Sequence, residues 1–299
     1  MGSRDVKVAV LGPGAVGGVL AVGLVRAGVP VVCVARPDTA NLIASEGLTL
    51  RHGSQEAETV RPEATSELRE RVDLLLVTVK APALDDALGR IQARPLTVIP
   101  LLNGIEHMQA IRRGLAESDV VAGSVSLIEA YLERPGTIVQ TTPAVVLTLA
   151  GDVDREAAEL LRRAGTEVRI DGNELEVLWQ KLARQAPVAA ATSLAQRPIG
   201  ELRNDPEWRP RLQAAVDETC AVAAGAGVSL TAAAQWEIID AMPPDLTSST
   251  ARDVAAGRPS ELDAITGAAV RAGRRLGIPI PTLERLFAEA EDACRAPSH

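Results

Sequence analysis

The sequence is poor in cysteine, histidine and aromatic residues. It contains three cysteines, three histidines and only 2% aromatic residues. Cys33, Cys220 and Cys294 are far apart and odd in number, so they indicate neither a disulfide framework nor a metal cluster. One of the three histidines is the C-terminal residue, which argues against a histidine-based catalytic triad or a zinc site. We therefore expect no metal cofactor.

Basic residues and long apolar runs are also scarce. The chain has 31 lysines and arginines against 39 aspartates and glutamates, and this acidic balance argues against a nucleic-acid partner. No apolar run approaches the length of about 20 residues that spans a bilayer. The first residues run into a predicted strand and do not resemble a signal peptide. We therefore expect a cytoplasmic protein with no membrane partner.

The length of 299 residues is enough for two domains with substantial cores. Strand and helix patterns are mixed up to a turn cluster at Asp171, Gly172 and Asn173, and the chain beyond it is helical by pattern. This change predicts an α/β domain over residues 1–172 and an all-α domain over residues 173–299.

A glycine motif near the N-terminus indicates what the first domain binds. Residues 7–11 are mostly apolar and β-branched, as in a buried strand, and residues 19–25 can continue as a helix. Between them, Gly12, Gly14 and Gly17 form the pattern G-x-G-x-x-G. Between a strand and a helix, this pattern predicts a Rossmann-type dinucleotide-binding domain. The alternative is a glycine-rich turn that binds nothing.

Each glycine of the motif has its own physical reason. Gly12 allows the tight turn, Gly14 lets the backbone approach a pyrophosphate, and Gly17 lets the helix pack closely on the strand. The phosphates would lie beside Ala15 and Val16, because unpaired N–H groups and the dipole at a helix N-terminus favour negative charge.

Arg36 follows the second predicted strand, residues 29–35. An acidic residue at this position holds the ribose 2′-hydroxyl of NAD, whereas an arginine accommodates the 2′-phosphate of NADP. Asp38 is a rival, but it follows Pro37 and fits the start of the next turn better. We therefore expect NADP(H); the alternative is that Arg36 is only a solvated charge at a strand end.

Lys80 and Asn103 follow two further buried strands, residues 73–79 and 96–102. Ligands of open α/β sheets bind at the carboxyl ends of the strands, so both residues are placed to face the cofactor. Each also has a plainer interpretation, since lysine commonly ends a strand and Asn-Gly is a strong turn signal.

Further strand patterns cover residues 48–52, 56–60, 120–132, 136–141, 144–149 and 167–170, and helical patterns cover residues 105–115 and 155–164.

The second domain opens with a predicted helix over residues 174–185. Lys181 lies at the border of its apolar face, and Gln185 lies one turn further along the same side. A border lysine is usually a surface residue whose stem packs on the apolar face, so periodicity alone does not make Lys181 catalytic. The apolar face consists of Leu175, Leu178, Trp179 and Leu182.

Four more predicted helices and one break complete the second domain. Helical patterns cover residues 207–226, 231–241, 260–277 and 281–295, and a proline- and serine-rich break covers residues 242–249. Ser260 and Asp263 fit a capping box at the start of the 260–277 helix. Glu261 lies in its first turn, where the helix dipole alone favours an acid.

Several motifs, taken in order, resemble those of the ketopantoate reductases (2-dehydropantoate 2-reductases). They are GPGAVGG at the N-terminus, DLLLVTVKA with Lys80, LLNGIEH with Asn103, LWQKLA with Lys181, and paired serines followed by SELD. The resemblance covers nearly the whole chain. It implies a dinucleotide-binding domain, an all-helical second domain and NADPH-dependent reduction of a small 2-oxo acid.

The resemblance also implies a role for each matched residue near the cofactor. The glycines of the motif would hold the pyrophosphate, and Arg36 would hold the 2′-phosphate of NADPH. Lys80 would line the cofactor site. Asn103 would lie between the nicotinamide ribose and the substrate.

For catalysis, the resemblance implies that Lys181 donates a proton to the carbonyl oxygen that hydride transfer turns into an alkoxide. Asn103 and Glu261 would belong to the same catalytic group. Glu261 would either orient the ammonium or bind a substrate hydroxyl. Gln185 and Ser249 would bind the substrate.

Some positions depart from the family pattern. Gln185 and Ala189 stand where the family usually has asparagines, Thr266 replaces an asparagine and Leu246 replaces a polar residue. A pocket that loses such hydrogen-bonding groups loses discrimination between substrates. We therefore expect either ketopantoate or a different 2-oxo acid or related carbonyl compound.

Two other functions remain open from the sequence. One is a hydroxyacid or opine-type dehydrogenase of the same family, acting on another carbonyl or imine. The other is a non-catalytic NADP-binding sensor, against which Lys181, Asn103 and Glu261 argue together, because a sensor needs no proton donor. The helical domain can also pair with itself, so a homodimer is an alternative to a monomer.

Overall fold

The computed structural model describes residues 6–53 and 55–295, and these form two compact units. The first unit contains residues up to 102 and residues 107–177. The second contains residues 103–106 and the chain from residue 178 onward. The first unit holds a parallel sheet with helices and the second is helical, which confirms the predicted fold class.

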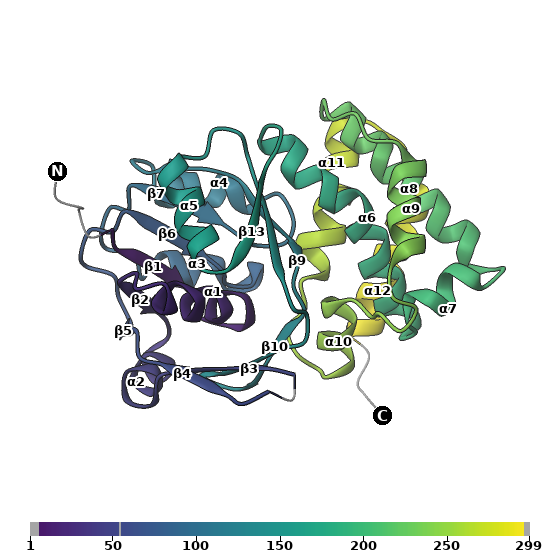
Figure 1. Ribbon diagram of the computed structural model, residues 1–299. Helices are drawn as coiled ribbons and strands as arrows, with labels where there is room; N and C mark the ends of the chain where they lie inside the picture. Colours follow the sequence, from purple (N-terminus) through teal and green to yellow (C-terminus); the bar gives the residue numbers. More distant parts are fainter. Residues whose placement is uncertain (1–5, 54, 296–299) are drawn as a thin grey trace. The chain divides into compact units, whose positions relative to one another are not determined.

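A six-stranded parallel sheet forms the centre of the first unit (Figure 1). Every residue of its three central strands β2, β1 and β6 is buried, which explains their continuous apolar sequences. From β1 the chain adds β2 and β5 on one side of the sheet and then β6, β7 and β8 on the other side. In such sheets ligands bind beside the point where the order switches sides, here at β1. In spatial order the strands are β5 (Glu63–Thr65), β2 (Val31–Val34), β1 (Val8–Leu11), β6 (Leu74–Val77), β7 (Thr97–Pro100) and β8 (Asp119–Val120).

Helix α1 (Ala15–Arg26) packs between this sheet and a second, four-stranded sheet. Two glycines of α1 permit its close packing, one on the four-stranded sheet and one on the residue that follows α5. A Cβ at Gly18 would lie 2.7 Å from Cδ1 of Ile138, and a Cβ at Gly23 would lie 2.1 Å from the carbonyl oxygen of Ala164. The other helices of the unit are α2 (Pro37–Glu46), η1 (Ala81–Ala83), α3 (Leu84–Leu88), α4 (His107–Gly114) and α5 (Arg155–Arg163).

The single strand predicted over residues 120–132 is wrong. This segment forms two longer strands, β9 (Gly123–Leu127) and β10 (Ala130–Arg134), which belong to different sheets. β9 joins β12 (Val145–Leu149) and β13 (Thr166–Ile170). β10 turns back through Gly136, whose φ is +77°, to pair with β11 (Thr137–Gln140). The rest of the four-stranded sheet is β3 (Leu48–His52) and β4 (Glu58–Val60).

Helix α6 (Glu174–Ala195) carries the chain from the first unit into the second. It continues ten residues beyond the predicted end at Gln185 and contains Pro187 in its interior. The expected break at residues 242–249 is followed by a short helix that the sequence pattern did not indicate, α10 (Ser249–Ala255). The remaining helices are α7 (Ile199–Asn204), α8 (Trp208–Gly225), α9 (Ala232–Ala241), the π-helix η2 (Asp263–Gly267), α11 (Ala268–Leu276) and α12 (Pro281–Arg295).

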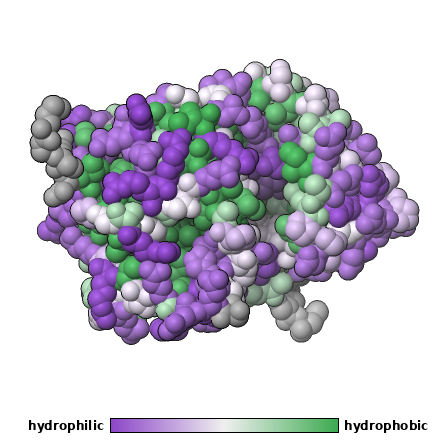
Figure 2. Space-filling model, viewed as in Figure 1, coloured by the Kyte–Doolittle hydropathy of each residue, from purple (hydrophilic) through white to green (hydrophobic). Residues whose placement is uncertain are grey.

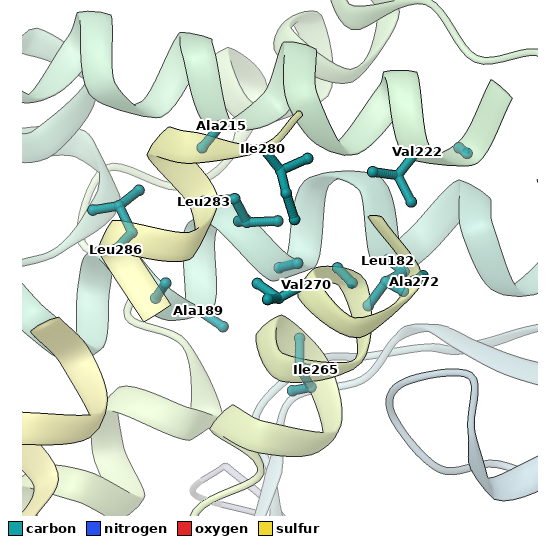
Figure 3. Close-up of a cluster of buried hydrophobic side chains, with 14 of the residues drawn as sticks. Leu182, Ala189, Ala215, Val222, Ile265, Val270, Ala272, Ile280, Leu283 and Leu286 are labelled. Atoms are coloured by element: carbon teal, nitrogen blue, oxygen red, sulfur yellow. The ribbon is translucent and has the colours of Figure 1, made fainter. Parts of the chain in front are cut away.

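Buried aliphatic side chains from α6, α8, η2, α11 and α12 form the core of the helical unit (Figure 3). Trp179 and Leu182 lie in this core, as the apolar stripe on α6 predicts. Leu175 does not, because its side chain is 45% exposed. Ala189 also lies in the core, next to the side chains of the C-terminal helices (Figure 3).

Polar side chains dominate the molecular face seen in Figure 2, and apolar ones appear there in small, interrupted groups. Within the described residues, no helix combines the length and the apolar character that crossing a membrane requires.

Substituting Gly23 tests the packing of α1. We expect Gly23→Ala to lower the free energy of unfolding by about 1–3 kcal/mol, because the added methyl group meets the Ala164 carbonyl oxygen. Gly114→Ala in α4 is the control, because its Cβ would make an ordinary 3.4 Å contact with Leu88. This substitution should raise the free energy of unfolding by up to about 1 kcal/mol. Urea unfolding of both variants measures the difference. Equal stability of the two variants would contradict this account.

Candidate active site

The loop between β1 and α1 is held in shape by contacts from the residues that follow β6. Gly12 has a φ of +83°, and a Cβ there would lie 2.4 Å from Cγ1 of Val79. A Cβ at Gly17 would lie 2.2 Å from Oγ1 of Thr78. The Thr78 hydroxyl donates toward the carbonyl oxygens of Leu11 and Gly12, at 3.0 and 2.8 Å. Sequence analysis missed Thr78, because the predicted strand over residues 73–79 places it inside the strand, whereas β6 ends at Val77.

The start of α1 fits an anion such as a pyrophosphate. Among the described residues beyond its chain neighbours, a Cβ at Gly14 would have one neighbour within 4 Å, the Gly12 carbonyl oxygen at 3.9 Å, so the space over this backbone is open. Among the described residues no side chain caps the helix, and its first turn contains no acidic residue. Ala15 and Val16, the first two helical residues, are half-buried. Their backbone N–H groups lack intrahelical partners and suit a negatively charged ligand.

Arg36 and Lys80 lie at the same edge of the parallel sheet as this loop. Arg36 follows β2 and precedes α2, and its side chain is exposed. Lys80 follows β6, directly before η1, and is also exposed. Because β1, β2 and β6 are parallel neighbours, their carboxyl ends lie side by side. Asp38, the rival to Arg36, lies within the first turn of α2.

In the second unit, four predicted residues join one hydrogen-bonded network centred on Asn103. The amide oxygen of Asn103 accepts hydrogen bonds from Lys181 Nζ at 2.7 Å and from Gln185 Nε2 at 3.0 Å. The amide nitrogen of Asn103 donates to Oε2 of Glu261 at 3.0 Å. Lys181 and Gln185 lie one turn apart on α6, and Glu261 lies just before η2. Residues 158 positions apart in sequence therefore meet through one amide.

Burial controls the acidity of the Lys181 ammonium. It lowers the pKa of Lys181 to about 8, the nearby Glu261 carboxylate opposes this by raising the pKa, and the Arg184 guanidinium lowers it further. The Glu261 side chain is itself buried, with 7% of its surface exposed. At neutral pH Lys181 is therefore protonated and is a stronger acid than an ordinary lysine. Such a group can donate a proton in general acid catalysis.

The segment that carries Asn103 is fixed against η2 and α11. Gly104 has a φ of +85°, and a Cβ there would lie 2.1 Å from the carbonyl oxygen of Ala264. Two residues on, Glu106 accepts two hydrogen bonds from the Arg271 guanidinium, at 3.0 and 2.8 Å. A side chain at position 104 would therefore collide with the backbone of η2. A π-helical turn such as η2 often marks a functional site.

The predicted capping box at Ser260 and Asp263 is wrong. Within the part of the chain that the structure describes, no side chain caps η2. The carboxylate of Asp263 instead accepts a hydrogen bond from Arg271 Nη1 at 2.6 Å. The Asp263 carboxylate is therefore used by an arginine eight residues further along the chain, which the four-residue capping pattern does not include.

The structure does not bring Ser249 into the Asn103 network. Ser249 is exposed at the start of α10. Its neighbour Ser248 caps this helix, accepting from the Ala251 N–H at 3.0 Å, and its hydroxyl lies 2.8 Å from the hydroxyl of Thr192 on α6.

The other positions that depart from the family pattern lie in packed surroundings. Ala189 is in the apolar core described above. The Thr266 hydroxyl is buried and donates to the carbonyl oxygen of Ala186 at 2.8 Å. Leu246 packs against a second cluster of buried residues in the helical unit.

Comparisons with known proteins agree with both halves of this description. Residues 8–151 match the family "Ketopantoate reductase PanE/ApbA", and residues 173–292 match "Ketopantoate reductase PanE/ApbA C terminal". The 2-dehydropantoate 2-reductase of Caulobacter vibrioides is 31% identical, over 92% of this chain and 94% of its own.

Solved structures share the fold over almost the whole chain. The PanE/ApbA family ketopantoate reductase of Ralstonia eutropha JMP134 is 31% identical, with a TM-score of 0.85, over 96% of this chain and 98% of its own. A D-mandelate dehydrogenase solved with NADH and anilino(oxo)acetate has a TM-score of 0.87 over 96% of this chain and 98% of its own. At 21% identity, that second likeness concerns the fold.

Titration of Lys181 tests the electrostatics of the network. The chain has only three lysines, Lys7, Lys80 and Lys181, so NMR of isotope-labelled lysine side chains can follow each one. We expect a pKa of about 8 for Lys181 and a lower pKa in Glu261→Gln, because the carboxylate that raises it is then gone. Glu284→Gln, which removes a carboxylate paired with Arg274, is the control and should leave the pKa unchanged. An unchanged or raised pKa in Glu261→Gln would refute the assignment.

Proposed function

Because the chain belongs to the ketopantoate reductase family, we propose that it is an oxidoreductase that reduces the carbonyl group of a small 2-oxo acid with NADPH. One observation carries the proposal above the others. The buried Lys181 ammonium, with its lowered pKa, is held by Asn103, which also binds Glu261. A proton donor of this kind is what the reduction of a carbonyl group needs.

The first domain, residues 1–172, is the proposed cofactor domain. The open backbone at Gly14 and the uncapped N-terminus of α1, with Ala15 and Val16, would bind the pyrophosphate. Gly12 and Gly17 would keep this loop in its shape. The exposed Arg36 guanidinium at the end of β2 would bind the 2′-phosphate of NADPH, and Lys80 would line the same site. When bound, the nicotinamide ring would supply the hydride.

The second domain, residues 173–299, is the proposed substrate domain, and Lys181 is its proposed proton donor. Lys181 would donate a hydrogen bond to the carbonyl oxygen, stabilise the charge that develops there, and then transfer its proton. Asn103 would aim the ammonium through the 2.7 Å hydrogen bond. Glu261 would keep Lys181 protonated near neutral pH, because its carboxylate raises the pKa that burial lowers.

Gln185 is the proposed group for a hydroxyl of the substrate. Its amide nitrogen is used by Asn103, while its amide oxygen is buried and accepts no hydrogen bond within the described part of the chain. A buried acceptor without a donor is costly, so a substrate hydroxyl would stabilise it. Ser249 is proposed as a second substrate-binding residue on the basis of its motif.

The substrate is proposed to be ketopantoate or another 2-oxo acid. Ala189 offers no hydrogen bond and lies in the apolar core, so it supplies nothing to grip a polar substrate group. This observation favours a 2-oxo acid whose binding depends on fewer hydrogen bonds than the amide-rich family pattern provides.

Turnover of ketopantoate tests the reaction. We expect NADPH absorbance to fall when ketopantoate or a related 2-oxo acid is added, and a panel of 2-oxo acids, with and without amines, separates the reductase from an opine-type dehydrogenase. Lys181→Ala should lower kcat by about 10²–10⁴-fold, because the proton donor is lost, while NADPH binding persists in a fluorescence titration. Normal turnover by this variant would overturn the mechanism. NADPH binding without turnover of any substrate by the wild type would favour a sensor.

Substituting Arg36 tests the choice of cofactor. We expect Arg36→Gln to raise the KM for NADPH roughly 10–100-fold, because a charge-assisted hydrogen bond to phosphate is worth about 1.5–3 kcal/mol. The KM for NADH serves as the internal control and should stay nearly constant. Parallel changes in both KM values, or no change in either, would exclude a role of Arg36 in recognising the 2′-phosphate.

A further inference from the structure

Arg184 is a half-buried cation on α6, three residues after Lys181. Burial lowers the pKa of this guanidinium, so its position carries a cost to the charged form. Side chains three residues apart on a helix are neighbours, and long side chains on a helix point toward its N-terminus. Arg184 follows this rule, because its Nη1 donates to the carbonyl oxygen of Gln180. The guanidinium therefore lies level with Lys181, whose pKa its charge lowers.

The hydrogen bonds of Arg184 leave most of its guanidinium unused. Besides the bond to Gln180, Nη1 donates a long one, of 3.4 Å, to Oε1 of the buried Gln235 on α9. Across residues 6–53 and 55–295, its Nε and Nη2 groups reach no acceptor and no carboxylate forms an ion pair with it. Arg271 in the same unit shows the usual alternative, since it binds both Glu106 and Asp263.

Around Lys181 the described residues place two cations, Lys181 and Arg184, beside one carboxylate, Glu261. The Glu261 carboxylate compensates one positive charge, that of Lys181, through Asn103. The charge of Arg184 has no counterpart within the described residues. Because the guanidinium is half-buried, its unused donors stay accessible and can bind one additional negative group from outside the chain.

We propose that Arg184 binds the carboxylate of the 2-oxo acid substrate, with its free Nε and Nη2 groups facing the two carboxylate oxygens. A guanidinium presents these two donors as a flat fork that matches a carboxylate. In a 2-oxo acid the carboxylate is attached to the reacting carbonyl, so its two partners must be neighbours, as Arg184 and Lys181 are on α6. This inference rests on the proposed function. It adds the residue that selects acids over neutral carbonyl compounds.

Binding of oxamate, an unreactive analogue of a 2-oxo acid, tests the carboxylate site without turnover. Calorimetry of the enzyme loaded with NADP⁺ should give a Kd for oxamate that rises roughly 10–100-fold in Arg184→Met, because the paired hydrogen bonds to the carboxylate are lost. Arg184→Lys, which keeps the charge but not the fork, should fall between wild type and Arg184→Met. Arg275→Met, at an exposed position of α11, is the matched control and should bind oxamate as wild type does.

Kinetics with an acid and its neutral methyl ester separate substrate recognition from a structural role. In Arg184→Met the KM should rise for the 2-oxo acid and stay nearly constant for the ester, whereas any change in kcat that follows from the raised pKa of Lys181 should be the same for both substrates. A purely structural role through Gln235 would affect both substrates equally, and Gln235→Met would reproduce it. Equal effects on acid and ester, or an unchanged Kd for oxamate, would overturn the inference, and Arg184→Lys decides the question if Arg184→Met does not fold.

The two proposals fail in different ways. Absence of turnover of every 2-oxo acid by the wild type would refute the proposed reaction. Oxamate binding that still depends on Arg184 would then support the anion site alone.

Discussion

The hydrogen bonds of one amide, that of Asn103, join the chemically active groups of the helical unit. An amide is suited to this task because it accepts at one end and donates at the other. It accepts from Lys181 and Gln185 and donates to Glu261, so the ammonium and the carboxylate are linked through a neutral group. Glu261 can therefore support the charge of Lys181 while the pKa of that lysine stays near 8, well below its ordinary value.

Much of the fold follows from local sequence. The apolar runs that form β1, β2, β6 and β7 are buried strands of one parallel sheet, and the strand–glycine–helix pattern at the N-terminus has the expected order. Features that depend on distant partners could not be predicted. Residues 120–132 look like one strand, yet β9 and β10 pair with different sheets. α6 continues through Pro187 because the packing of its apolar side compensates the local penalty of a proline.

The candidate site was predictable as a set of residues but not as a geometry. Asn103, Lys181 and Glu261 came from motifs far apart in the sequence, and no pattern indicates that one amide joins them. Arg184 was not predicted as a site residue, although it lies between Lys181 and Gln185 in the sequence. A charged residue three positions after a suspected catalytic lysine would have been the signal, since it shares part of the same helix surface.

The segment 103–106 limits how the two units could be exchanged between proteins. It leaves the first unit after β7, contributes Asn103 to the helical unit, and returns to the first unit at His107. The helical unit is therefore not a contiguous gene fragment. A recombination event that transplanted residues from 178 onward onto another nucleotide-binding partner would separate Lys181 and Glu261 from the amide that links them. A chimera of this kind keeps the hydrogen-bonded link only when the recipient supplies an equivalent asparagine at this position.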